Sequence, residues 1–210
     1  ETVSRIPDRL KAWDPGEYVS DANTYYKPFD PKKPLALEII DPGSTFCAKL
    51  FQNIEETNFA DRYNLTYIAY PIPDAKHPDG FRFPHSQLVA SYLEALKKHP
   101  LKNVSPPADW QILEKMFIGK DASGVSYQIQ FNTVYSKREA EDQLLKWLIE
   151  IGYSQPEIIV IQQSALSVDT KSLLEKQKEI VEKKIKTIKI PTIMFDGRRY
   201  DRAVGPEKLK

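Results

Sequence analysis

The segment Pro34–Phe51, PLALEIIDPGSTFCAKLF, contains the change of hydrophobic period that decides the fold. Its first part, Pro34–Ile40, is a short apolar run typical of a buried strand. Asp41-Pro-Gly breaks the run, and Ser44 is a good N-cap residue for a helix. From there the apolar residues follow the spacing of one helix face: Cys47, Leu50, Phe51 and Ile54. The segment therefore predicts a buried strand leading directly into a helix.

The flanking sequence extends this unit into a mixed sheet. Leu65–Ile72 predicts a second strand, which gives strand–helix–strand, the start of a parallel βαβ unit. Near the C-terminus, Asp196-Gly197 is a strong two-residue turn between two short predicted strands, Thr192–Phe195 and Arg198–Asp201. A long helix is expected before this hairpin, from about Asp169 to Ile188. A hairpin added to a βαβ unit predicts one mixed sheet.

The middle of the chain predicts a mainly helical insertion. Two amphipathic helices are indicated around Leu88–Leu96 and Trp110–Phe117, and Ser136 with Glu139 forms a capping box that opens a third. Two segments are less regular: Val125–Phe131 alternates like a strand, and Pro156–Gln163 fits a strand or a short helix.

These elements divide the chain into an N-terminal arm and two interleaved parts. Residues 1–23 form the arm, and a short strand is expected just after it, near Thr24–Tyr26. Residues 24–74 and 168–210 form the two halves of one α/β domain, and residues 75–167 form the helical insertion between them. The fold class predicted is therefore α/β, a central mixed sheet flanked by helices.

Composition excludes several classes of function. The chain has 210 residues and a net charge of +1, so no global field attracts nucleic acid. One cysteine excludes an intrachain disulfide and a cysteine-rich zinc site, and the three histidines lack metal-ligand spacing. No apolar run is long enough to span a bilayer. We therefore expect no metal, no cofactor and no nucleic-acid partner.

Three features around Ser44 could carry chemistry, and each also has a structural interpretation. Ser44 and Cys47 can be an ordinary helix cap and a buried cysteine, but a helix N-terminus also stabilises an anion and lowers the pKa of a cysteine placed there. Glu38 is either exposed at a sheet edge or a half-buried carboxyl with a raised pKa, able to shuttle a proton. Ile190-Pro191 either ends the long helix or forms a cis bond at a tight bend.

Taken in order, these features resemble the DsbA-type thiol–disulfide oxidoreductases of the thioredoxin-fold superfamily, from about Tyr25 to the C-terminus. In that family an acid precedes the first cysteine of Cys-x-x-Cys by six residues, as Glu38 precedes Ser44 here. The family also has a helical insertion, a long helix, a cis-proline and a hairpin, in the order found in SLLEKQKEIVEKKIKTIKIPTIMFDGRRY (Ser172–Tyr200). The fold implied is a thioredoxin fold with an inserted helical domain.

The resemblance implies a role for each site residue. Ser44 stands at the position of the nucleophilic cysteine, Cys47 at that of the resolving cysteine, and Glu38 at that of the proton shuttle. The substrate would contact the remaining positions, of which Pro191 would be cis: Thr45, Phe46, Ile190 and Pro191.

Two departures from the family pattern bear on function. The segment GPEKLK (Gly205–Lys210) supplies barely a turn of the family's final helix. More importantly, serine cannot form the mixed disulfide, so we expect the chain to be an inactive Cys-to-Ser variant, at Ser44, of an enzyme that exchanges disulfides with extracytoplasmic protein substrates.

Two alternatives stay open for Ser44. One is a glutathione-binding protein similar to the kappa-class transferases, in which Ser44 would donate a hydrogen bond to the glutathione thiolate. The other is a non-catalytic peptide-binding or chaperone module.

The resemblance further implies the partners and the location. The partners would be unfolded or cysteine-containing proteins and a redox partner protein, membrane-bound or not. The chain would be a monomer in the bacterial periplasm or at the cell surface, with its signal or anchor removed.

Overall fold

A four-stranded mixed sheet forms the centre of the structure, a computed structural model that describes residues 12–210. The strand order is β2-β1-β3-β4. The strands are β1 (Leu35–Ile40), β2 (Asn64–Ala69), β3 (Thr192–Phe195) and β4 (Arg198–Tyr200). β1 pairs with β2 in parallel, whereas the β1–β3 and β3–β4 pairs are antiparallel. The predicted βαβ unit, its added hairpin and the α/β fold class are confirmed.

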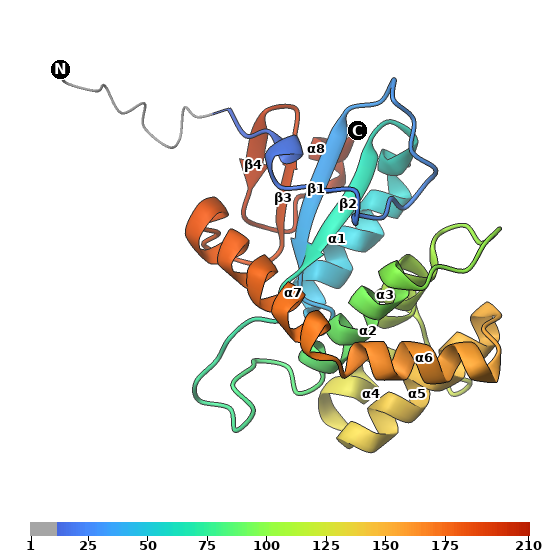
Figure 1. Cartoon of the computed structure of the whole chain (residues 1–210). Helices are drawn as coiled ribbons and strands as arrows, with labels where there is room; N and C mark the ends of the chain where they lie inside the picture. The colour runs from blue at the N-terminus through green and yellow to red at the C-terminus, as the bar shows by residue number, and fades with distance from the viewer. Residues whose placement is uncertain (1–11) are drawn as a thin grey trace.

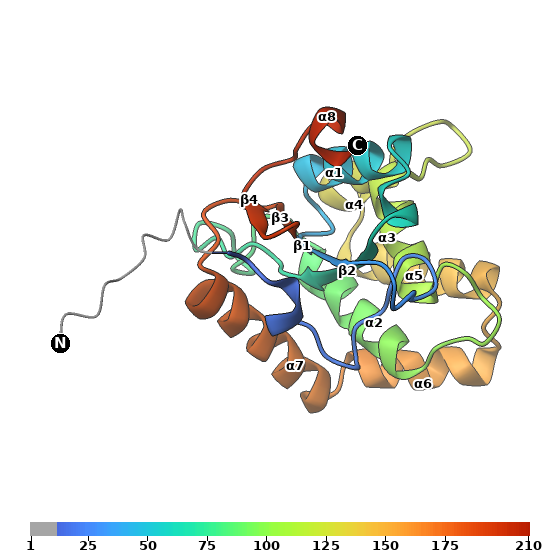
Figure 2. The ribbon, with the colours of Figure 1, turned by 90° about the horizontal axis from the view of Figure 1, so that it is seen from above.

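Helices cover both faces of this sheet (Figure 2). On one face lie α1 (Thr45–Glu56) and α8 (Pro206–Leu209), and on the other lies α7 (Val168–Glu179), continued by a π-type turn, Ile180–Ile185. Between β2 and α7 in the chain come five helices that gather at one side of the sheet (Figure 1). They are α2 (Ser86–Lys98), α3 (Ala108–Ile118), α4 (Tyr127–Thr133), α5 (Lys137–Ile151) and α6 (Gln155–Ala165). No helix within residues 12–210 is both long and apolar enough to cross a membrane.

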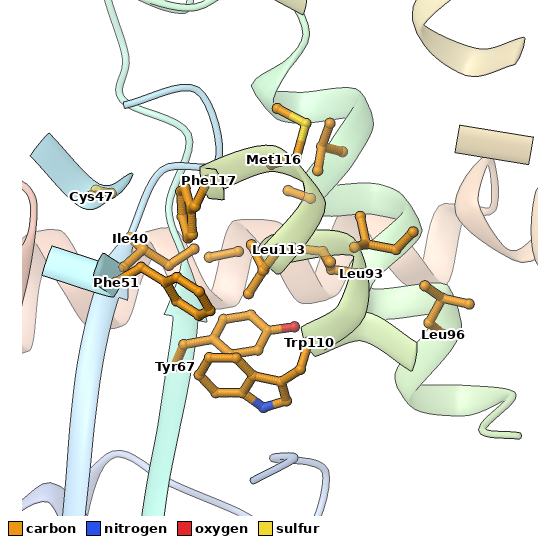
Figure 3. Close-up of a cluster of buried hydrophobic side chains, with 14 of the residues drawn as sticks. Ile40, Cys47, Phe51, Tyr67, Leu93, Leu96, Trp110, Leu113, Met116 and Phe117 are labelled. Carbon is orange, nitrogen blue, oxygen red and sulfur yellow. The ribbon is translucent and has the colours of Figure 1, made fainter. Parts of the chain in front are cut away.

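The central strand β1 is buried on both faces because its side chains alternate between two apolar clusters. Ala36 and Ile40 belong to the larger cluster, which fills the space between the sheet, α1, α2 and α3 (Figure 3). Leu37 and Ile39 belong to the smaller one, together with residues of the π-type turn. Glu38 therefore points to the same face as Ala36 and Ile40, toward the helix that begins at the candidate site.

Several sequence predictions of local structure are confirmed and others are wrong. Ser136 and Glu139 form the predicted capping box of α5, and Pro156–Gln163 is helical, within α6. Val125–Phe131 is not a strand, because Tyr127 begins α4, whose two buried side chains are spaced by a helical step. The predicted long helix ends early: the π-type turn closes at Ile185, so Ile188 lies in a loop and is 83% exposed.

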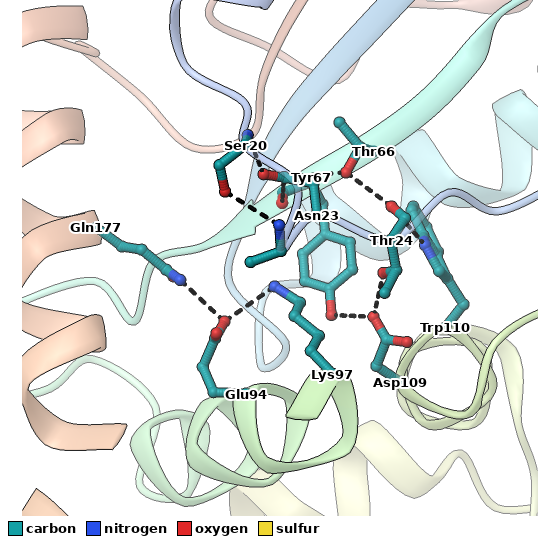
Figure 4. A network of polar contacts seen from close by, with 11 residues as sticks. Ser20, Asn23, Thr24, Thr66, Tyr67, Glu94, Lys97, Asp109, Trp110 and Gln177 are labelled. Atoms are coloured by element: carbon teal, nitrogen blue, oxygen red, sulfur yellow. Dashed lines mark hydrogen bonds and ion pairs between the residues drawn. The ribbon is translucent and has the colours of Figure 1, made fainter. Parts of the chain in front are cut away.

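The segment that follows the predicted N-terminal arm lies beside β2 without forming a strand. The first eleven residues of the predicted arm lie outside the described residues. No strand is present at Thr24–Tyr26, although the Tyr26 N–H donates to the Leu65 carbonyl at 3.0 Å. The Thr24 carbonyl accepts from the Thr66 hydroxyl at 2.7 Å and from the Trp110 indole N–H at 3.3 Å (Figure 4). Side-chain bonds thus replace the ladder expected there.

Candidate functional site

The junction between β1 and α1 places Ser44 at the helix N-terminus. Ser44 has an extended backbone, and its Oγ accepts a hydrogen bond from the Cys47 N–H at 3.3 Å, which confirms the predicted N-cap. The preceding turn is anchored by the buried Asp41 carboxylate. This carboxylate accepts from the N–H of Gly43 at 2.9 Å and from that of Ile72 at 2.8 Å. The turn is therefore tied to the start of the loop that follows β2.

Two amide side chains of α4 hold the same turn from the other side. Gln128 donates to the carbonyls of Pro42 at 2.9 Å and Ser44 at 3.0 Å. Asn132 donates to the Gly43 carbonyl at 2.9 Å. Three successive carbonyls before α1 thus find partners on α4. Neither residue could be identified from the sequence, because nothing in their spacing indicates which distant carbonyls they reach.

Cys47 lies one turn into α1 and is 0% exposed. Burial raises the pKa of its thiol, an effect only partly offset by hydrogen bonds from the Ser44 hydroxyl and from the Asp41 N–H, whose nitrogen is 3.4 Å from Sγ. The thiol is therefore protonated at neutral pH and shielded from reagents in solution. Ser44 is also largely buried, at 3% exposed, whereas Thr45 and Phe46 face outward.

Glu38 is a buried carboxyl and not an edge residue. β1 is central in the sheet, and Glu38 is 1% exposed between its strand partners Tyr67 and Ile193. Desolvation raises its pKa to about 8, and its Oε1 has no hydrogen-bond partner within the described residues. Its charge also raises the pKa of Cys47, which places the two groups within electrostatic reach. Glu38 can thus hold or release a proton near neutral pH.

A groove of about 780 Å³ brings Phe46 together with Ile190 and Pro191. The Ile190–Pro191 peptide bond is cis. Phe46 is 68% exposed at the rim, and the wall also includes Tyr70 and Ile188. Of the residues expected to bind substrate, Thr45 does not line this groove. The structure thus forms two groupings: Ser44, Cys47 and Glu38 at the helix start, and Phe46, Ile190 and Pro191 in the groove.

The arrangement has specific chemical limits. A serine hydroxyl and a single buried thiol cannot close a disulfide, so residues 44 and 47 cannot exchange electrons as a pair. The site does place the N-terminus of α1 at residue 44, where its N–H groups and dipole favour an anion at the position of the Ser44 Oγ. No cluster of three or more metal-ligating side chains occurs in the part of the chain that the structure describes.

Comparison with known proteins finds likeness in structure and not in sequence. No protein-family model matches the chain, and no curated protein matches it. Solved structures do match over almost the whole chain. The MdbA protein, a thiol–disulfide oxidoreductase from Corynebacterium diphtheriae, has a TM-score of 0.61 and 12% identity, covering 91% of this chain and 95% of its own. The fold is that of the DsbA-type thioredoxin-like proteins.

Two further structures agree with this assignment. The α-DsbA1 protein of Wolbachia pipientis has a TM-score of 0.61 at 11% identity, covering 91% of this chain and 88% of its own. A thioredoxin-like oxidoreductase from Silicibacter pomeroyi DSS-3 has a TM-score of 0.58 at 12% identity, covering 90% and 89%. At such identities the likeness defines the fold, and the function has to be argued from the site.

Proposed function

We propose that this chain is the serine form of a DsbA-type thiol–disulfide oxidoreductase, in which a cysteine at position 44 would restore activity. The observation that carries the proposal is the position of Ser44: it caps α1 one turn before the buried Cys47, while Phe46 of the same turn shares a groove with the cis-Pro191. The solved structures that the chain resembles include several thiol–disulfide oxidoreductases. Their function supports the proposal by analogy of fold.

With cysteine at position 44, the site would exchange electrons in two balanced steps. A substrate thiolate attacks the sulfur of residue 44 in the 44–47 disulfide, forms a mixed disulfide and releases the Cys47 thiolate, which takes a proton from Glu38. A second substrate thiolate then attacks the substrate sulfur of the mixed disulfide. The substrate gains a disulfide, and residue 44 leaves as a thiolate stabilised by the α1 N-terminus. With Ser44 in place, neither step can occur.

The direct test is the substitution Ser44→Cys. We expect it to reduce insulin with a thiol donor and to oxidise a reduced test protein, and we expect the chain with Ser44 to do neither. Ser167→Cys is a matched control, since Ser167 also caps a helix, with its side chain accepting from the Thr170 N–H, but has no cysteine one turn later. No gain of activity in a folded Ser44→Cys protein would refute the proposal.

The remaining parts of the proposal concern partners and location. The substrates would be unfolded or cysteine-containing proteins outside the cytoplasm, and a separate redox protein would renew the disulfide. The chain would act as a monomer.

The two alternatives make different predictions. A glutathione-binding protein would show saturable glutathione binding by calorimetry, because the Ser44 hydroxyl can still donate while its Oγ accepts from the Cys47 N–H. A peptide-binding module would keep its affinity in Cys47→Ala and stay inactive in Ser44→Cys.

A further inference from the structure

The groove beside Phe46 and Pro191 continues into a second hollow of about 690 Å³. Ile188 and Asp201 line both, so the two hollows adjoin. The second lies between the π-type turn and the β3–β4 hairpin, and its wall includes Trp13 and Tyr200. The two adjoining hollows are called here the extended groove, and the first of them includes Phe46 and Pro191 of the candidate site.

The first hollow carries an excess of positive charge. Three exposed cations line it, and none forms an ion pair within residues 12–210: Arg82, Lys189 and Arg202. Its carboxylates are Glu182 and Asp201. Glu182 accepts from the Tyr70 hydroxyl at 2.7 Å, and Asp201 is neutralised by Arg199, which donates to both carboxylate oxygens at 2.9 Å. Three cations that form no ion pair within the described residues therefore line this hollow with one carboxylate that lacks a cationic partner.

The second hollow is more basic still. Four more exposed cations line it, again without an ion pair in the described part of the chain: Lys184, Lys186, Arg198 and Lys208. Arg199 also lines this hollow, but its guanidinium N–H groups already donate to the Asp201 carboxylate and to the carbonyls of Ile185 and Lys186. The whole chain has a net charge of only +1, so this is a local concentration of positive charge.

We propose, resting on the function proposed above, that the extended groove selects polypeptide segments in which acidic residues flank the reacting cysteine. Phe46 and Ile190 supply apolar contacts near the sulfur, and the cations farther along meet carboxylates of the bound segment. Hollows of about 780 and 690 Å³ can hold an extended chain, whereas a flat membrane surface would touch only their rims. Lys189 and Arg202 line the same hollow as the cis-proline, so they are the first candidates for setting this preference.

Binding can be tested in the chain as it stands, without thiol chemistry. Two labelled peptides would carry serine in place of cysteine and differ only in having Asp or Asn at the flanking positions. Fluorescence anisotropy should show about an eightfold preference for the Asp peptide, the product of about twofold from each of three exposed charge pairs. The preference should shrink as salt is raised.

A charge-reversal variant identifies the side chains responsible. Arg82→Glu, Lys189→Glu and Arg202→Glu together should abolish the preference or invert it. The matched control reverses three exposed lysines that line neither hollow, Lys32→Glu, Lys102→Glu and Lys146→Glu, and should leave it intact. Equal binding of both peptides, or an equal effect of the two triple variants, would overturn the inference. So would binding to phosphatidylglycerol vesicles with no peptide preference.

The same peptides with cysteine restored separate this inference from the function on which it rests. In the Ser44→Cys protein, kcat/KM for exchange should favour the Asp peptide by the same factor. If the Asp peptide binds better but Ser44→Cys has no exchange activity, the proposed function fails and the charge preference stands. If exchange occurs at equal rates for both peptides, the proposed function stands and the charge preference fails.

Discussion

The buried carboxyl of Glu38 should make the stability of this protein depend on pH in a defined direction. In the folded chain its pKa is raised to about 8 from an ordinary value of 4.5, because burial penalises the charged form. The unfolded chain ionises near the ordinary value, so between the two values the unfolded state loses a proton that the folded state keeps. The free energy of unfolding must therefore fall as pH rises through this window, and level off above about pH 8.

The size of the effect follows from the two pKa values. They differ by 8 − 4.5, or about 3.5 pH units, and each unit corresponds to about 1.36 kcal/mol. Glu38 thus lowers the free energy of unfolding by up to about 5 kcal/mol at pH 8 and above, and by almost nothing at pH 4. Because it is 1% exposed, solvent screening removes little of this effect. Against a typical domain stability of about 5–15 kcal/mol, the cost is large.

The substitution Glu38→Gln removes the titration while keeping the shape of the side chain. Urea unfolding at a series of pH values should show the variant gaining stability over the parent between pH 5 and pH 8, with the difference rising toward about 3–5 kcal/mol. At pH 4 the variant should be equal or slightly less stable, since its amide hydrogens gain no partner. Other titrating groups are shared by both proteins and cancel in the difference. Parallel pH curves for the two proteins would refute the assigned pKa.

Two further predictions concern the helix start. Gln128→Ala leaves the Pro42 and Ser44 carbonyls without their side-chain donor and should lower the free energy of unfolding by about 2–3 kcal/mol, measured in urea. Gln130→Ala, two positions along α4 with its amide donating to Asp121, should cost less, and an equal loss would contradict the role given to Gln128. The Cys47 thiol should react with an aromatic disulfide reagent at least about a hundredfold more slowly in the folded chain than in urea. Comparable rates would show that the thiol is not shielded.

The elements with a strong local signal were predictable from the sequence. Ser44, Ser136 and Asp196-Gly197 each act through hydrogen bonds or backbone angles of residues within a few positions, so their spacing alone identified a cap, a capping box and a hairpin turn. The buried strand β1 and the face of α1 were likewise visible as a change from a continuous apolar run to the spacing of one helix face.

Two other predictions of secondary structure were wrong, because the hydrophobic pattern of the segment does not decide its conformation. Val125–Phe131 alternates in hydrophobicity, yet forms the start of α4, because Gln128 buries its amide against the turn before α1. Ile188 fits the apolar stripe of the preceding helix, but the π-type turn ends at Ile185 so that the chain can enter the cis-Pro191 bend. In the first case the deciding partner lies on another element, where residue spacing carries no information, whereas in the second Pro191 follows Ile188 by only three residues.

Glu38 also bears on whether this site is suited to serine or to cysteine at position 44. The buried carboxyl of Glu38 lowers stability near neutral pH, and a group kept at such a cost points to a functional use. With Ser44 that use is absent, because no disulfide forms between residues 44 and 47 and Glu38 therefore has no released thiolate to protonate. The proposed enzyme therefore predicts opposite effects of Glu38→Gln: in the Ser44 chain it should only stabilise, whereas in the Ser44→Cys protein it should also slow thiol exchange near pH 7. If folded Ser44→Cys proteins exchange thiols at equal rates with glutamate and with glutamine at position 38, Glu38 has no role in the exchange reaction.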